Sequence, residues 1–244
     1  MGITLTVISS SSSGNAYVIQ SEDEALLLEA GSSLSTTKHD ALNFNTSKVN
    51  GCLITHAHGD HSKYARQYEL AFPVFANSHV ISMKGLSQAA EIKAGDRFDV
   101  GKFKIIAFEA FHDIPTLGFF INHPDMGNLV FLTDSFMCNH VFKDVNHVLI
   151  ECNYSDEALL EAIELGVTNS AMRRRLMTTH MELQTVAKFL TSHDLTNVYN
   201  ILLLHLSRYN SNRKQFIDVL TKATGKNIQI ADAGLVIDLS NSPY

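Results

Sequence analysis

The sequence is poor in the features that direct a protein out of the cell or into a membrane. It holds only three cysteines, Cys52, Cys138 and Cys152, widely spaced and each in or beside an apolar stretch. An odd number of such thiols indicates free, buried cysteines in a reducing compartment. No apolar run approaches the roughly 18 residues of a membrane span, and the first residues lack the basic and apolar regions of a signal peptide. We therefore expect a cytoplasmic protein with no membrane partner.

Positive charge is scarce as well. The chain has 19 lysines and arginines against 25 aspartates and glutamates, a net charge of −6, so its overall field does not attract nucleic acid or anionic lipid. Proline- and glycine-rich linkers, charge runs and repeats, which would mark domain boundaries, are also missing. With 244 residues and 45% hydrophobic side chains, the chain can bury a sizeable core. We expect one domain that spans residues 1–244.

A dense group of histidines follows the apolar run at residues 49–54. His56, His58, Asp60 and His61 lie close together in the pattern H-x-H-x-D-H. Neutral imidazole nitrogens and carboxylate oxygens are ligands that zinc, manganese and iron accept. Ordinary solvated or capping roles would explain one or two loop histidines, but not the whole run. The pattern therefore predicts a metal site that takes further ligands from later in the chain.

Polar residues also recur where predicted strands end. The pattern of apolar runs predicts strands interspersed with helices, as in layered α/β folds. In such folds the strand ends along one edge lie near one another and hold the site. The residues that follow predicted strands in this way are His56, His112, Asp134, Glu151 and His205.

The order of these residues resembles the metallo-β-lactamase superfamily. The H-x-H-x-D-H run is followed by a lone histidine, then Thr133-Asp134, then a histidine after a late strand, so the resemblance covers nearly the whole chain. The branches it resembles most are the YycJ-like proteins and the tRNA 3′-processing endonuclease RNase Z. The stretches at residues 9–15, 149–154 and 205–210 resemble YycJ-like sequences in particular. The resemblance implies an α/β fold, a four-layer αββα sandwich.

The resemblance also implies a pair of divalent transition-metal ions, either zinc, which we favour, or manganese. Three histidines would hold the first ion: His56, His58 and His112. Asp60, His61 and His205 would hold the second, and Asp134 would bridge both. Two cations so close together can share a hydroxide and lower its pKa toward neutrality.

A carboxylate–histidine pair, Glu151 and His180, matches the pair that serves proton transfer to the leaving oxygen in the endonuclease branch. A glutamate beside an imidazole favours the charged ring, which suits a general acid. The plainer alternatives are a surface carboxylate for Glu151 and a helix N-terminal residue for His180. With Asp60 and Asp134, this pair forms the combination seen in phosphodiesterase branches, so we expect Asp60, Glu151 and His180 to be catalytic.

Two stretches are candidates for substrate binding. Ser12, Ser13 and Asn15 lie in a serine-rich turn whose hydroxyl and N–H groups could meet an anionic substrate, although a flexible turn explains them equally well. Arg208 and Asn210 follow His205 in a stretch that resembles YycJ-like proteins.

Two further features have no settled role. The run Arg173-Arg174-Arg175 before His180 fits a solvated helix face or a phosphate contact equally well. Glu29 stands where the superfamily more often has an aspartate that supports the metal loop, so its support geometry must differ.

The expected activity is dinuclear-metal-dependent hydrolysis of a phosphodiester, in nucleic acid or in a nucleotide. One alternative is a cyclic nucleotide phosphodiesterase of the kind that phages use against host signalling, which would act in the host cytoplasm. A second is a lactone or thioester hydrolase, since the superfamily spans several reactions. A non-catalytic module that keeps its metals for stability is the third. The resemblance to phosphodiesterases, which are often dimers, also suggests a homodimer.

Overall fold

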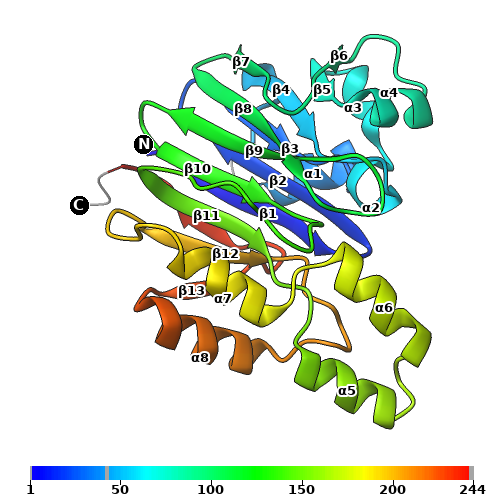
Figure 1. Cartoon of the computed structure of the whole chain (residues 1–244). Coiled ribbons are helices and arrows are strands. Elements are labelled where there is room, and N and C mark those ends of the chain that lie inside the picture. Colours follow the sequence, from blue (N-terminus) through cyan, green and yellow to red (C-terminus); the bar gives the residue numbers. More distant parts are fainter. Residues whose placement is uncertain (1, 42–43, 242–244) are drawn as a thin grey trace.

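Two seven-stranded sheets lie face to face in the computed structural model, which describes residues 2–41 and 44–241 (Figure 1). The strands of the first sheet, in spatial order, are β14 (Val236–Asp238), β1 (Thr4–Ser11), β2 (Gly14–Gln20), β3 (Ala25–Leu28), β4 (Val49–Ile54), β5 (Val74–Ala76) and β6 (Ala90–Glu91). Those of the second are β13 (Ile228–Ile230), β12 (Asn200–Leu204), β11 (Val145–Glu151), β10 (Gly127–Leu132), β9 (Thr116–His123), β8 (Phe103–Ala110) and β7 (Arg97–Val100).

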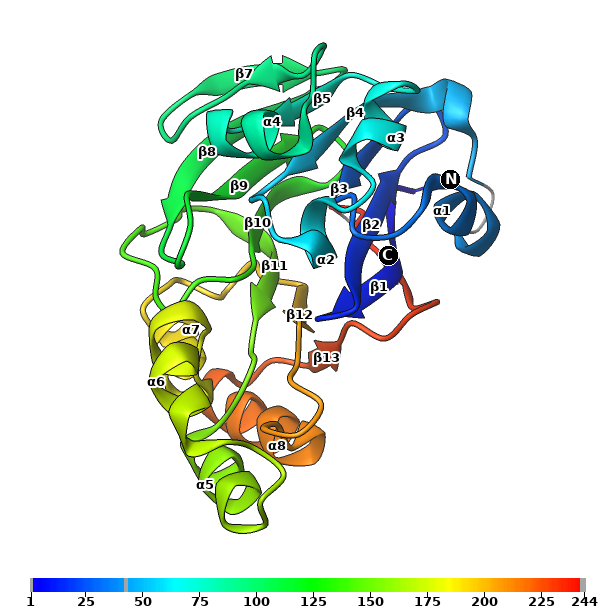
Figure 2. The same ribbon diagram turned by 90° about the vertical axis from the view of Figure 1, so that its right-hand side faces the viewer.

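Helices cover the outer face of each sheet, so the molecule has four layers (Figure 2). On the first sheet they are α1 (Leu34–Asp40), α2 (Gly59–Ser62), α3 (Ala65–Glu69) and α4 (Ser78–Lys84), with the 3-10 helix η1 (Thr46–Lys48) before β4. On the side of the second sheet lie α5 (Asp156–Glu164), α6 (Ser170–Thr179), α7 (Leu183–Thr191) and α8 (Arg213–Thr224). The predicted αββα fold is confirmed.

The apolar side chains form one core between the sheets and one beneath each helical layer. Leu5, Leu28 and Phe119 are among those buried between the sheets. Val186 of α7 and Phe216 of α8 pack on the outer face of the second sheet. The central strands are therefore buried on both faces, which explains their continuous apolar runs.

The neighbouring strands β3, β4 and β5 are parallel, as are β10, β11 and β12, so the carboxyl ends within each set share one edge. Three residues that follow such strands have a positive φ: Glu29 (66°), Asp134 (45°) and His205 (52°). This conformation costs a non-glycine residue on the order of 1–3 kcal/mol and persists only where surrounding contacts impose it. The backbone strain is thus concentrated at the strand ends that bear the predicted site.

Two local features differ from the sequence pattern. Strand β1 extends to Ser11 and β2 begins at Gly14, so only Ser12 and Ser13 remain as the turn of the serine run. The bounds of helix α6 are not marked by an apolar stripe in the sequence, although its arginine run fits the solvated helix face considered there. None of the helices within residues 2–41 and 44–241 combines the length and apolar character that a membrane crossing needs.

Candidate metal centre

The segment after β4, a short loop that leads into α2, supplies four of the predicted ligands and is called the metal loop. Its backbone leaves the strand at Thr55, and α2 begins at Gly59, so the chain reverses within a few residues. The turn is held from inside, because the Ser62 hydroxyl donates to the His58 carbonyl (2.7 Å). His56 and His61 are fully buried, which is rare for such polar rings unless they have partners.

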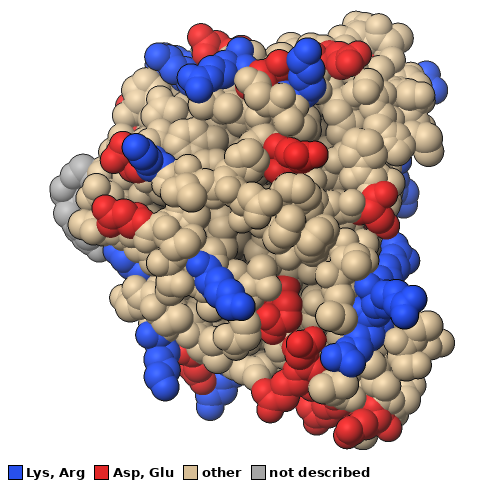
Figure 3. All heavy atoms as spheres, viewed as in Figure 1, with Lys and Arg blue, Asp and Glu red and all other residues tan. Residues whose placement is uncertain are grey.

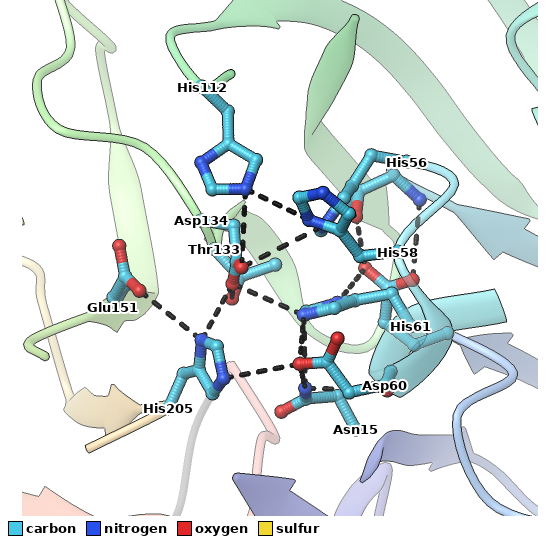
Figure 4. Close-up of polar contacts among 12 residues, drawn as sticks. Asn15, His56, His58, Asp60, His61, His112, Thr133, Asp134, Glu151 and His205 are labelled. Carbon is cyan, nitrogen blue, oxygen red and sulfur yellow. Dashed lines mark hydrogen bonds and ion pairs between the residues drawn. The ribbon is translucent and has the colours of Figure 1, made fainter. Parts of the chain in front are cut away.

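Three imidazoles converge on one point at the first predicted site (Figure 4). The Nδ1 atom of His58 lies 3.1 Å from Nε2 of His56 and 3.1 Å from Nε2 of His112. Oδ2 of Asp134 lies 3.7 Å from both Nε2 atoms. A tetrahedral zinc ion with bonds of about 2.0–2.1 Å separates its ligand atoms by about 3.3 Å. The spacing of these four atoms therefore fits one such ion.

The hydrogen-bond partners of Nδ1 in His56 and in His112 indicate which ring nitrogen carries the proton. The Thr55 hydroxyl donates to Glu29 Oε1 (2.5 Å), so it accepts from Nδ1 of His56 (2.9 Å). The Thr179 carbonyl accepts from Nδ1 of His112 (2.6 Å). As assigned from these bonds, both rings carry a lone pair on Nε2, aimed at the same point. Burial, followed by the charge of His61, holds the pKa of His56 well below its usual value, so this ring is a neutral donor suited to a cation.

A second convergent group lies beside the first. Nε2 of His61 is 3.2 Å from both Asp60 Oδ2 and Asp134 Oδ1, and Nε2 of His205 is 3.3 Å from Asp60 Oδ2. Asp134 faces the first group with Oδ2 and the second with Oδ1, as a bridging carboxylate would. Nε2 of His205 is buried without a hydrogen-bond partner, which costs about 1–3 kcal/mol unless something satisfies it. A cation at this point would do so.

The electrostatics of the second group also favour bound positive charge. Burial opposes ionisation of Asp60 and Asp134, yet His61 and His205 hold the pKa of both carboxyls below the usual value. Burial likewise opposes charge on His61 and His205, but Asp134 raises the pKa of both rings well above the usual value. The donor sets of both groups thus fit a dinuclear metal site.

Glu29 supports the metal loop directly. Its buried Oε2 accepts from the Thr55 N–H (3.3 Å), and Oε1, which binds the Thr55 hydroxyl, lies 3.4 Å from Nδ1 of His61. One carboxylate therefore orients His56 through Thr55 and faces His61 directly. Burial raises the pKa of Glu29, against the opposing charge of His61.

Glu151 is buried, which excludes the surface carboxylate considered from the sequence. Its Oε1 lies 2.6 Å from Nδ1 of His180 and 3.3 Å from Nδ1 of His205. Its Oε2 accepts from the N–H groups of Ser135 (3.1 Å) and Met181 (3.0 Å). Burial disfavours a charged His180, but the Glu151 carboxylate outweighs burial and raises the pKa of the ring. His180 is the C-cap of α6, not the helix N-terminal residue considered from the sequence.

The residues expected to bind substrate lie in different environments. Asn15 is buried against the second group, with Nδ2 3.0 Å from His61 Nε2 and 3.3 Å from Asp60 Oδ2. Ser12 and Ser13 are exposed at the β1–β2 turn. Substrate binding by any of these three residues stays a prediction.

The remaining two lie in the loop after β12. Arg208 is exposed, with its guanidinium 5.3 Å from the centre of the Tyr209 ring. Asn210 is buried, and its Oδ1 accepts from the Thr168 hydroxyl (2.8 Å), a contact that holds the loop. Their role toward substrate also stays a prediction.

Several residues that contact the metal centre are not marked by any recognisable pattern in the sequence. Ser10 Oγ accepts from the His205 N–H (2.9 Å) and from the Tyr17 hydroxyl (2.7 Å), which ties the serine run to a strained ligand. Asp113 Oδ1 lies 3.1 Å from His112 Nε2 and 3.5 Å from His58 Nε2, at the rim of the site. In the sequence, only the position of Asp113 next to His112 indicates that it lies near the site.

Comparison with known proteins agrees with this geometry. A family model for the metallo-beta-lactamase superfamily matches residues 11–74, which include the histidine loop. The exodeoxyribonuclease YycJ of Bacillus anthracis is 28% identical over 232 residues, covering 86% of this chain and 85% of that protein. The chain thus resembles the metallo-β-lactamase superfamily, as its sequence predicts. A second relative, the exodeoxyribonuclease WalJ of Streptococcus pneumoniae (strain D39), is 25% identical over the whole chain and 94% of its own length.

Three solved structures share the fold over almost the full length. The metallo-β-lactamase fold protein YhfI of Bacillus subtilis superposes with a TM-score of 0.76 at 16% identity, covering 97% of this chain and 99% of that one. The short form of human tRNase Z gives a TM-score of 0.61 at 18% identity, with coverage of 97% and 99%. A diphosphatase of the PhnP family gives 0.66 at 14% identity, with coverage of 97% of both chains. At these identities the likeness is one of fold.

Proposed function

We propose that this protein is a phosphodiesterase of the metallo-β-lactamase superfamily that cleaves nucleic acid, with an exonuclease acting on DNA as the form best supported. The observation that carries the proposal is the pair formed by the buried Glu151 and the partly exposed His180. The pair lies beside Asp134, whose Oδ2 is 4.0 Å from Nδ1 of His180. A hydrolase of lactones or thioesters has no need of this pair. The naming of two relatives as exodeoxyribonucleases supports the choice of DNA.

The protein residues would divide the work as follows. His56, His58 and His112 would hold one divalent cation, Asp60, His61 and His205 the other, and Asp134 both. The bound pair would supply an activated water and neutralise the charge that builds on the phosphoryl oxygens. Glu29 and Asn15 would keep the ligand residues in position.

His180 would act as the general acid. Because its Nδ1 is bonded to Glu151, the proton on Nε2 is the one free to move to the leaving oxygen. Glu151 keeps the ring charged, and the two backbone N–H groups on its Oε2 keep the carboxylate ionised and correctly turned.

A substrate panel tests the proposal. Protein loaded with manganese or zinc should degrade end-labelled DNA, and metal analysis should give close to two ions per chain. Asp134→Ala should lose both ions and activity, whereas Asp125→Ala, an exposed aspartate at the opposite end of β10, should behave as wild type. Turnover of cyclic mononucleotides or of a lactone alone, or protein without bound metal, would overturn the proposal.

A further inference from the structure

Three consecutive arginines, which we call the arginine row for their order in the chain, are exposed on α6 beside the metal centre. The row is Arg173, Arg174 and Arg175, and all three side chains are exposed. In Figure 3 the blue patch at the right-hand edge lies over α6, above the red patch of α5. Because the whole chain carries a charge of −6, this local cluster stands out against an acidic background.

Helix α6 is fastened to the site, so the arginine row has a defined place relative to it. The last helical residue, Thr179, accepts the hydrogen bond from the ligand His112 (2.6 Å), and the next residue is His180. Nη2 of Arg175 lies 4.0 Å from Oδ2 of Asp113, the carboxylate at the rim of the site. One guanidinium of the row therefore reaches the mouth of the metal centre.

The arginine row is free to bind an external anion. The neighbouring helix α5 carries four acidic residues, and the two helices pack through a small cluster that includes Leu159 and Leu176. Even so, among the described residues Arg173 and Arg174 form no ion pair, and Arg175 has only its long contact with Asp113. A solvated helix that served stability alone would gain from such pairs, whereas free guanidinium groups match phosphate geometry well.

We propose that the arginine row binds the backbone phosphates of a single nucleic-acid strand whose scissile bond lies at the metal centre. This inference rests on the proposed function and names how its substrate is held. Arg174 and His180 are six positions apart in the chain, a rise of about 9 Å along a helix. The rise along one strand of a duplex is about 3.4 Å per nucleotide and is larger in an extended strand, so the row lies within about three nucleotides of the reaction. The arginine row would therefore favour long substrates without taking part in the chemistry.

The first test separates binding of the strand from chemistry. The triple variant Arg173→Gln/Arg174→Gln/Arg175→Gln is compared with wild type and with Arg97→Gln, an exposed arginine on the far edge strand β7. KM for a 20-nucleotide single strand should rise about 10- to 100-fold in the triple variant. The slope of log KM against log salt concentration should also decrease by the amount that corresponds to about two phosphate contacts. KM and kcat for the p-nitrophenyl ester of thymidine 5′-phosphate, and the metal content, should change less than twofold. An unchanged KM for the long strand, or an equal loss on the ester, would overturn the inference.

The second test does not depend on cleavage. Anisotropy of a fluorescent phosphorothioate 20-mer, which keeps its charges and resists hydrolysis, reports binding to the metal-loaded protein. Weaker binding with a lower salt slope in the triple variant, and not in Arg97→Gln, supports the inference; equal binding by all three proteins refutes it. A wild type that binds this strand but hydrolyses no phosphodiester would sink the proposed function and leave the role of the arginine row standing.

Discussion

Gly31 is the position where the smallest substitution should do the most damage. A Cβ atom there would lie 1.8 Å from the Asp60 carbonyl oxygen and 2.5 Å from the Asn15 nitrogen, both backbone atoms. The chain on either side is already bonded to the metal loop, since the Ala30 N–H donates to the His61 carbonyl (2.8 Å). Real contacts of this kind stay beyond 3.0 Å, so Gly31→Ala must push the Asp60 backbone back by about 1.2 Å in a tightly packed interior.

The expected cost follows from that displacement. Overpacking against backbone destabilises by about 3 kcal/mol or more, which lowers the Tm of a chain this long by about 6–12 °C. A ligand carboxylate displaced by about 1 Å should reduce turnover at least 10²-fold. Asp60 belongs to the second convergent group, so one of the two ions should be lost first.

Gly59→Ala is the matched control. Gly59 lies inside the H-x-H-x-D-H run, yet a Cβ atom there meets nothing within 4 Å, so stability should change by less than about 1 kcal/mol. Thermal melts, metal content and phosphodiesterase rate decide between the two variants. A Gly31→Ala protein with normal stability and two bound ions would show that the close packing of β3 on the metal loop is not what holds the site.

Three more outcomes follow from particular contacts. His180→Ala should slow cleavage of DNA by about 10²–10⁴-fold but spare the p-nitrophenyl ester, whose leaving group needs no proton; equal losses on both substrates would contradict the general-acid role. Glu29→Gln should weaken metal binding about 10- to 100-fold, measured by competition with a chelator, and unchanged affinity would contradict the support of Thr55 and His61. Burial lowers the pKa of His147 to about 4, so the unfolded chain binds the proton more readily. Stability should therefore be full above about pH 6.5 and fall as the pH drops toward 4, by about 2 kcal/mol at pH 5. Urea titrations of His147→Gln should lack this loss, and an identical pH profile would refute it.

The local sequence determined the nature of the site and the class of the fold. His56, His58, Asp60 and His61 lie so close in the chain that one turn after a strand brings them together, whatever the rest of the fold does. The continuous apolar runs predict buried strands, because strands covered on both faces have no polar face to alternate with. The types of metal ligand follow from side-chain chemistry alone, so the sequence is enough to identify them.

The tertiary structure decided how those residues are held and what surrounds them. No pattern shows that Glu29 adopts a positive φ and reaches Thr55, that Thr179 orients His112, or that Ser10 binds the His205 backbone. Each of these contacts joins segments far apart in the chain, and their geometry depends on the packing of two sheets. Gly31 and Gly59 are the same residue type in the sequence. Only the structure shows that Gly31 packs against backbone atoms, whereas a Cβ at Gly59 would meet nothing within 4 Å. The sequence thus specifies which side chains are available to bind metal and to catalyse. The packing of the two sheets decides which of them lie close enough together to do so.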